Sequence, residues 1–349
     1  MSLETEQREP DQLAGVDPPE YPHAVIGHQQ PRERLSALLD GGRLPGGILM
    51  HGPRGIGKAT LAFQLAREIF ERTGDEAATP VAEQVAAGGY PNLRVLRKAA
   101  KETGKGFYTA IRVEEVRELV DRLHKTRGRA GHRIVVVDAI DDCNVSSANA
   151  LLKILEEPPP ETLFLLISHR PGQLLPTIRS RCQQLAMRPL GDDEVRQVLA
   201  KAHPDAAPAD IDAAVSLAAG RPRRGLEALL LGNAEGLTRL RQWLGDPATP
   251  PAATHLAIAD ILAADRDGAQ ARFARDLVLG WLAEEARQAA GAGPAGRSRL
   301  ASASELWEKA LAMFEDADIY NLDARQTLVT LFDAIRKHVF KQIQLSEQR

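Results

Sequence analysis

One glycine-rich segment carries the residue types of a phosphate-binding loop. Gly52, Gly55 and Gly57 lead directly into Lys58. Glycines at this spacing let backbone N–H groups point inward at phosphate oxygens, and a helix that begins at the same place adds a favourable dipole. A lysine at this position can reach the outer phosphates. The segment therefore predicts a site for the phosphates of a nucleotide.

The elements on either side are those that a P-loop requires. The apolar run 47–50 predicts a buried strand, and the pattern 61–66 predicts a helix. The position after Lys58 normally carries a Ser or Thr hydroxyl that ligates magnesium, but here it is Ala59. Thr60 comes one residue late, about 100° further round the helix, so we expect it to point elsewhere. The phosphate cradle is present and the metal ligand is absent.

A second apolar run supplies an acid of the same site. It predicts a buried strand of a parallel sheet that ends in Asp138, from which a carboxylate can hold magnesium through water. ATP-hydrolysing P-loop proteins often place a Glu directly after this acid as general base, but here the residue is Ala139. Asp141 and Asp142 lie further along the turn, where we expect a carboxylate to miss the γ-phosphate. Since two independent groups are missing from one reaction, we expect no efficient ATP hydrolysis by this chain.

Length and composition limit the class of protein. The 349 residues predict two or three domains, and 4% aromatic content favours helices over β-sandwiches. A formal net charge of −3 leaves any DNA contact to local basic patches. Two cysteines exclude an internal four-cysteine zinc site and fit a reducing cytoplasm. We find no secretory signal and no run of about 18 apolar residues, so we expect a cytoplasmic protein outside the membrane.

Changes of periodicity divide the chain into four segments. Residues 1–20, rich in Glu, Gln, Pro and Asp, predict a disordered leader. Strands alternating with helices over residues 21–187 predict an α/β domain with a parallel sheet. Only helical periodicity follows, which predicts a small helical lid over residues 188–234 and an all-helical domain over residues 235–349.

Two further motifs carry a family resemblance. The helical stretch 149–157 is stopped by three prolines, and Ser180-Arg181-Cys182 follows further on. With the P-loop and the strand between them, these motifs resemble the AAA+ clamp loaders of bacteria over residues 25–223. The resemblance implies an AAA+ P-loop domain, a lid, and a helical collar for oligomerisation.

The resemblance implies roles for the matching residues. Arg181 would be an arginine finger that acts in trans, stabilising charge at the γ-phosphate of ATP held by a neighbouring subunit; on its own it is equally a surface residue. Ser168 matches the sensor-1 position. Arg223 resembles the sensor-2 arginine of the lid, although Arg221 and Arg224 leave its register open. The degenerate nucleotide site would comprise Gly52, Gly55, Gly57, Lys58, Asp138, Ser168 and Arg223.

Departures from the family pattern indicate the kind of subunit. Motor subunits usually carry Ser or Thr at the position of Ala59 and Glu at that of Ala139. The chain therefore resembles a non-catalytic stator, which keeps the finger without a catalytic site of its own. The family's four-cysteine zinc module has no counterpart in residues 71–90, which contain no Cys, so we expect no zinc.

The resemblance also implies partners. These would be motor subunits of the gamma/tau type, the clamp-opening delta subunit, the sliding clamp indirectly, and primer–template DNA within the complex. Nucleotide polymerisation would belong to the polymerase holoenzyme. The P-loop would bind ATP or ADP without hydrolysing it, or would keep only its fold. The rivals are an active gamma/tau-like ATPase, in which Thr60 or Asp141 replaces the lost groups, and a binding module that uses ATP only to lock its fold.

Two basic clusters and one apolar segment have two readings each. The clusters would contact DNA phosphates or form solvated surface charge. The segment 25–27 resembles the one that touches adenine in the family, or simply enters the core. The clusters consist of Arg94, Arg97, Lys98, Lys101 and Lys105, and of Lys125, Arg127, Arg129 and Arg133.

Overall fold

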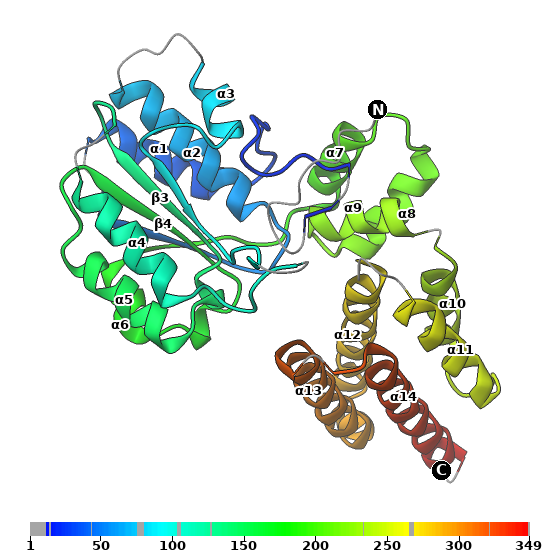
Figure 1. The fold of residues 1–349 in the computed structure, drawn as a ribbon. Coiled ribbons are helices and arrows are strands. Elements are labelled where there is room, and N and C mark those ends of the chain that lie inside the picture. Colours follow the sequence, from blue (N-terminus) through cyan, green and yellow to red (C-terminus); the bar gives the residue numbers. More distant parts are fainter. Residues whose placement is uncertain are drawn as a thin grey trace. The chain divides into compact units, whose positions relative to one another are not determined.

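The chain divides into two compact units, residues 1–226 and residues 227–349. We expected a boundary between residues 234 and 235; the division falls earlier, inside helix α9 (Pro222–Leu231). The computed structural model (Figure 1) describes residues 12–13, 15–42, 44–74, 80–102, 106–125, 128–232, 234–264, 269–320 and 322–347.

The described residues of the first unit form a five-stranded parallel sheet, which confirms the predicted α/β class. Its strand order is β2-β3-β4-β1-β5, and every neighbouring pair is parallel. Because the carboxyl ends of parallel strands meet at one edge, this order brings the segments after β1, β3 and β4 together. The strands are β1 (Gly47–His51), β2 (Leu93–Leu96), β3 (Arg133–Asp138), β4 (Thr162–Ser168) and β5 (Gln183–Ala186).

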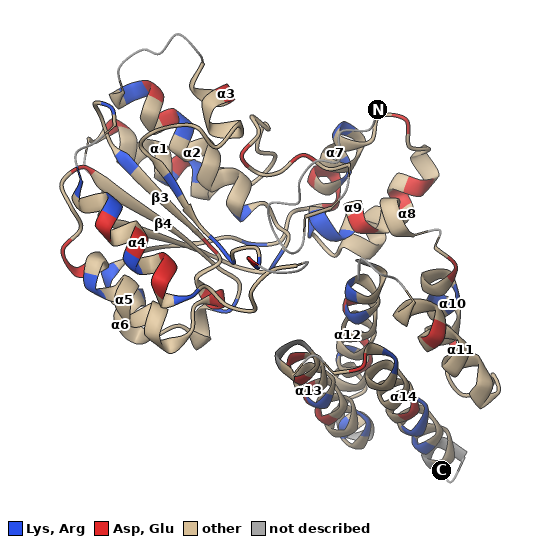
Figure 2. Cartoon of the chain, in the orientation of Figure 1, with Lys and Arg blue, Asp and Glu red and all other residues tan. Residues whose placement is uncertain are grey.

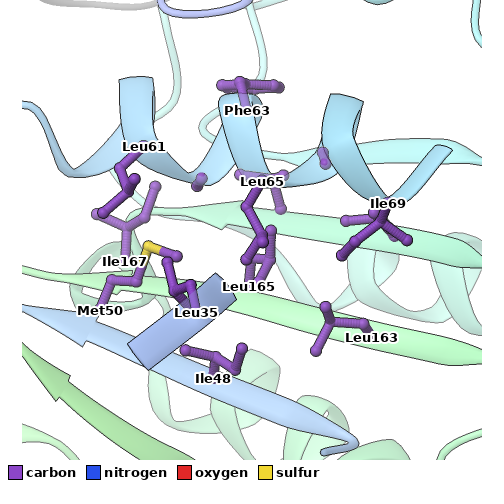
Figure 3. Close-up of a cluster of buried hydrophobic side chains, with 14 of the residues drawn as sticks. Leu35, Ile48, Met50, Leu61, Phe63, Leu65, Ile69, Leu163, Leu165 and Ile167 are labelled. Carbon is purple, nitrogen blue, oxygen red and sulfur yellow. The ribbon is translucent and has the colours of Figure 1, made fainter. Parts of the chain in front are cut away.

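Helices cover both faces of the sheet, so the central strands are apolar along their whole length. Successive residues of β1 alternate between the two sides: Ile48 and Met50 pack beneath α2, as Figure 3 shows, and Leu49 packs on the opposite side. One face carries α1 (Gln29–Asp40), α2 (Lys58–Thr73) and α3 (Val81–Ala86). The other carries α4 (Val113–His124), α5 (Val145–Glu156) and α6 (Pro176–Arg181).

Two lid helices, α7 (Asp192–Ala202) and α8 (Pro208–Ala218), precede α9. A glycine with φ +72° makes the turn between α8 and α9. A Cβ at Gly220 would lie 2.7 Å from the Leu190 carbonyl oxygen, so no other residue fits there without a shift. The Leu190 N–H also donates to the Gly220 carbonyl at 2.8 Å. This turn fixes where the first residues of α9 lie.

The second unit is helical throughout its described residues, as expected. Buried apolar side chains such as Trp243, Phe332 and Ile335 form its core, and the His255 imidazole lies 3.0 Å from an Asp333 carboxylate oxygen. No helix within the described ranges is long and apolar enough to cross a membrane. The helices are α10 (Glu235–Gly245), α11 (Ala252–Ala263), α12 (Ala269–Gly291), α13 (Arg297–Tyr320) and α14 (Ala324–Glu347).

Candidate functional site

The glycine loop borders a cavity of about 540 Å³ at the carboxyl edge of the sheet. The φ angles of Gly52, Gly55 and Gly57 are +153°, +79° and +96°, values that residues with a Cβ rarely adopt. A Cβ at Gly52 would lie 2.2 Å from the Met187 carbonyl oxygen. Residues 54–60 line the cavity directly. The loop therefore has the backbone form of a phosphate cradle that runs into the first turn of α2.

Lys58 is held inside this loop. Its side chain is buried, and its ammonium donates hydrogen bonds to the carbonyl oxygens of Gly52 at 2.8 Å and Pro53 at 2.6 Å. Burial lowers the pKa of Lys58 to about 8, although the nearby carboxylates of Asp138 and Asp141 act to raise it. The cation thus lies between the loop and the second acid, as a P-loop lysine should.

The cavity beside the second acid is also lined by the polar residues Thr60 and Asp142. Asp138 and Ala139 both line the cavity, and Ala59 packs partly against the core. Thr60 also borders the cavity, while the direction of its hydroxyl stays a prediction. Among the described residues, no three His, Cys, Asp or Glu side chains gather as metal ligands.

Asp141 has a structural position that the sequence pattern did not reveal. Its carboxylate accepts hydrogen bonds from the Ser168 hydroxyl at 2.9 Å, the His169 N–H at 2.6 Å and the Arg170 N–H at 3.1 Å. Both of its oxygens are therefore engaged by the segment that follows β4. Ser168 is fully buried and is not among the residues that line the cavity. The sensor-1 candidate thus faces Asp141.

The lid contributes Arg223 to the cavity. Its N–H donates to the Gly55 carbonyl at 3.1 Å, and a Cβ on Gly55 would lie 2.9 Å from the Arg223 Cβ. Of the three neighbouring arginines, Arg223 lines the cavity, whereas Arg221 and Arg224 do not. Of the three candidates, Arg223 is therefore the one that lies at the cavity, and its sensor-2 role stays a prediction.

Part of the predicted leader forms a wall of the same cavity. Residues 12–13 and 15–19 line it, and the buried Glu20 carboxylate accepts a 2.7 Å bond from Arg97. Arg67 donates to the Glu20 carbonyl at 3.1 Å. The prediction of disorder is wrong for this part, because buried polar contacts tie it down; residues 1–11 and 14 lie outside the described residues.

The segment 25–27 meets the cavity and the core at once. Val25 and Ile26 line the cavity, and Val25 also packs against the buried cluster beneath α2. His28, which follows, places its Nε2 2.6 Å from the Ile56 carbonyl oxygen, and burial lowers its pKa, so the neutral ring can donate there. The segment 25–27 therefore both packs against the core and borders the cavity, so these two interpretations do not exclude each other.

Several residues of the basic clusters make local contacts. Arg97 pairs with Glu20, and the Lys98 ammonium lies 3.1 Å from an Asp142 carboxylate oxygen. Arg133 donates to the Leu123 carbonyl. Lys105 and Arg127 lie outside the described residues. Figure 2 shows Lys and Arg interspersed with Asp and Glu along α2, α4 and α14. Contact with DNA stays a prediction.

Arg181 lies at the opposite end of the sheet from the cavity. It ends α6 just before β5, whose first residue pairs with Ile48 near the start of β1, whereas the P-loop follows the other end of β1. Five residues of strand at about 3.3 Å each separate these ends by on the order of 15 Å. The half-exposed Arg181 side chain pairs with Glu156 at 2.6 Å. It therefore faces away from this chain's own P-loop.

Comparison with known proteins places these features in a family. Residues 27–191 match the family described as "DNA polymerase III, delta subunit". The DNA polymerase III subunit delta' of Pseudomonas aeruginosa is 37% identical over 178 residues, which is 50% of this chain and 52% of that protein. The subunit delta' of Yersinia pestis is 35% identical over 156 residues, 44% of each chain.

A relative with a different subunit name is also similar. The DNA polymerase III subunit gamma/tau of Mycobacterium bovis is 33% identical over 181 residues, 51% of this chain and 30% of that protein. The chain spans about half the length of the delta' relatives that it matches. With the P-loop, the second acid and the Ser-Arg-Cys motif, these matches show that residues 27–191 belong to the AAA+ clamp-loader family and resemble its delta prime subunit.

Proposed function

We propose that this chain is a delta-prime-like stator subunit of a bacterial DNA polymerase III clamp loader. It helps to load the sliding clamp on primed DNA and supplies Arg181 to the ATP site of a neighbouring gamma/tau motor subunit. The delta subunit and primer–template DNA are further partners in the same complex. Clamp opening and ATP turnover belong to the assembly, and this chain contributes position and charge.

One observation carries this proposal: the finger and the P-loop lie at opposite ends of one sheet. Arg181 lies near the amino end of β1 and the phosphate cradle follows its carboxyl end, so this guanidinium is not placed to serve its own cradle. At the amino edge of the sheet it would instead face another subunit's γ-phosphate. There a guanidinium stabilises the charge that develops in the transition state. The two alanines beside Lys58 and Asp138 point the same way, since they remove the metal ligand and the general base from this chain's own site.

We further propose that the cavity binds ATP or ADP without hydrolysing it. The residues fit a nucleotide: the glycine loop offers backbone N–H groups, and Lys58 and Arg223 offer positive charge where phosphates would lie. They fit a catalytic magnesium ion poorly, because Asp138 is left without the hydroxyl ligand beside it. Bound nucleotide would hold the P-loop, the lid and the segment 12–20 together.

The rival function is an active motor, in which Thr60 or Asp141 would replace the missing groups. The contacts of Asp141 argue against it as one of these two substitutes. Asp141 would have to point at an attacking water, yet both of its oxygens accept hydrogen bonds from Ser168, His169 and Arg170. Thr60 borders the cavity and is the observation that still favours the motor.

Steady-state ATP hydrolysis on primed DNA with clamp separates the two readings. We would compare the chain alone, the reconstituted loader, and loaders carrying Arg181→Ala or Lys58→Ala. If the chain is a stator, it hydrolyses no ATP alone. The loader with Arg181→Ala then hydrolyses ATP more slowly, and the loader with Lys58→Ala keeps most of its activity. Turnover by the chain alone that is abolished by Lys58→Ala and unaffected by Arg181→Ala would establish a motor.

A further inference from the structure

The guanidinium of Arg181 is held at two points. Its Nη2 lies 2.6 Å from the Glu156 carboxylate, and its Nη1 donates to the Thr177 carbonyl at 3.1 Å. Thr177 lies one turn back in α6, whereas Glu156 is the last residue of α5. An arginine has five N–H donors in a rigid plane, so these two contacts fix its orientation and leave donors for another anion.

The ends of α5 and α6, which carry Glu156 and Arg181, pack on the buried core of the sheet. Leu155, Ile178 and Cys182 belong to one buried cluster. The Cys182 sulfur and a Leu155 methyl group close over Gly47 at the start of β1, where an added Cβ would lie 3.0 Å and 3.5 Å from them. Burial raises the pKa of Cys182 to about 11, so it stays a neutral packing group. Glu156 and Arg181 are exposed, but each follows or precedes a residue of this shared buried cluster: Leu155 comes directly before Glu156, and Cys182 directly after Arg181.

We propose that Glu156 is a positioning residue for Arg181. The Arg181 side chain is 34% exposed and would sample many rotamers if it were not anchored, because a free arginine side chain is conformationally mobile. The carboxylate limits it to one orientation at the edge of the sheet. This inference rests on the proposed function, since it assigns Glu156 an effect on a neighbour's ATP site that passes only through Arg181.

A double-mutant cycle in the reconstituted loader tests this coupling. The full-length chain would carry Glu156→Gln, Arg181→Ala or both, and loaders of identical subunit composition would be compared by kcat and KM for ATP on primed DNA with clamp. Glu156→Gln should lower kcat about three- to five-fold, the rate equivalent of an exposed ion pair, with little change in KM. In the Arg181→Ala background, it should have no further effect.

Two other variants refine the test. Glu157→Gln, one residue along and also exposed, removes an acid from the same helix end and should leave kcat unchanged in both backgrounds. Glu156→Asp keeps the carboxylate and should retain more of the rate than Glu156→Gln.

The outcomes separate this inference from the proposed function. An equal loss from Glu156→Gln with and without Arg181, or no loss while Arg181→Ala slows the loader, overturns the positioning role alone. An Arg181→Ala loader with full activity overturns the proposed function itself.

Discussion

The two ends of the parallel sheet differ in the groups that they carry, and under the proposed function they would serve different parts of one reaction. The carboxyl end has the glycine loop, Lys58 and a cavity, but Ala59 and Ala139 stand where a metal ligand and a general base would be. The amino end has no phosphate cradle and presents Arg181, anchored and half-exposed. If the proposed function holds, nucleotide binding and nucleotide hydrolysis are separable in this fold. A cradle is made by backbone geometry, whereas hydrolysis depends on single side chains that one substitution removes.

The largest expected effect falls on the amino end. Arg181→Ala should slow hydrolysis at the neighbouring motor site by about 10³, the lower bound for an arginine finger. Arg181→Lys should restore little, since an ammonium lacks the planar fork. Single-turnover hydrolysis in the loader measures this step, while hydrolysis at motor sites that do not adjoin this chain serves as the internal control. If the loaders with Arg181→Ala and Arg181→Lys both hydrolyse ATP at the wild-type rate, Arg181 is not an arginine finger and the proposed difference between the two ends of the sheet is wrong.

At the carboxyl end, the loop backbone should matter more than any side chain on it. Gly52→Ala would place a methyl group 2.2 Å from the Met187 carbonyl oxygen, so we expect a loss of about 3 kcal/mol in the free energy of unfolding of the first unit. Gly172→Ala is the matched control, since a Cβ there meets nothing within 4 Å. Thermal unfolding of both variants checks this; equal midpoints would contradict the described loop.

Asp141 should contribute to stability and not to catalysis. Asp141→Ala leaves the buried Ser168 hydroxyl and two backbone N–H groups without their acceptor, at an expected cost of about 2 kcal/mol in the free energy of unfolding. Asp142→Ala, which removes the partly exposed partner of Lys98, should cost less than about 1 kcal/mol. Denaturant unfolding compares the two, and a hydrolytic defect in Asp141→Ala without a loss of stability would favour the motor reading.

The smallest effect concerns the protonation of Lys58. Phosphate binding favours the charged ammonium, and the pKa of Lys58 in the free site is about 8. Below pH 8 the charge is already present, so affinity for ADP should be flat. Above pH 8 a proton must be taken up on binding, so the dissociation constant should rise up to about ten-fold per pH unit. Titration of a fluorescent ADP between pH 7 and 9.5 measures this. Lys58→Arg, which stays charged, should show no such rise.

Local patterns were enough to predict several of the longer elements of the first unit. The strands ending at His51 and Asp138 lie where apolar runs predicted them, because a strand covered on both faces must be apolar throughout. The helices after residue 188 follow from spacing and from breaks at Gly191 and Gly220. The short strand β5 and helix α3 were not predicted, since neither is long enough to show a period.

The sequence by itself determined which chemical groups exist: a glycine loop with its lysine, an acid after a buried strand, alanines at two catalytic positions, and an arginine before a cysteine. Tertiary structure alone decided which of these groups meet. Glu20 reaches Arg97, Asp141 reaches Ser168, and Glu156 reaches Arg181 only because the sheet and its helices bring distant segments side by side. Such pairs leave no periodic trace, because hydrogen bonds and ion pairs depend on separation in space and not along the chain.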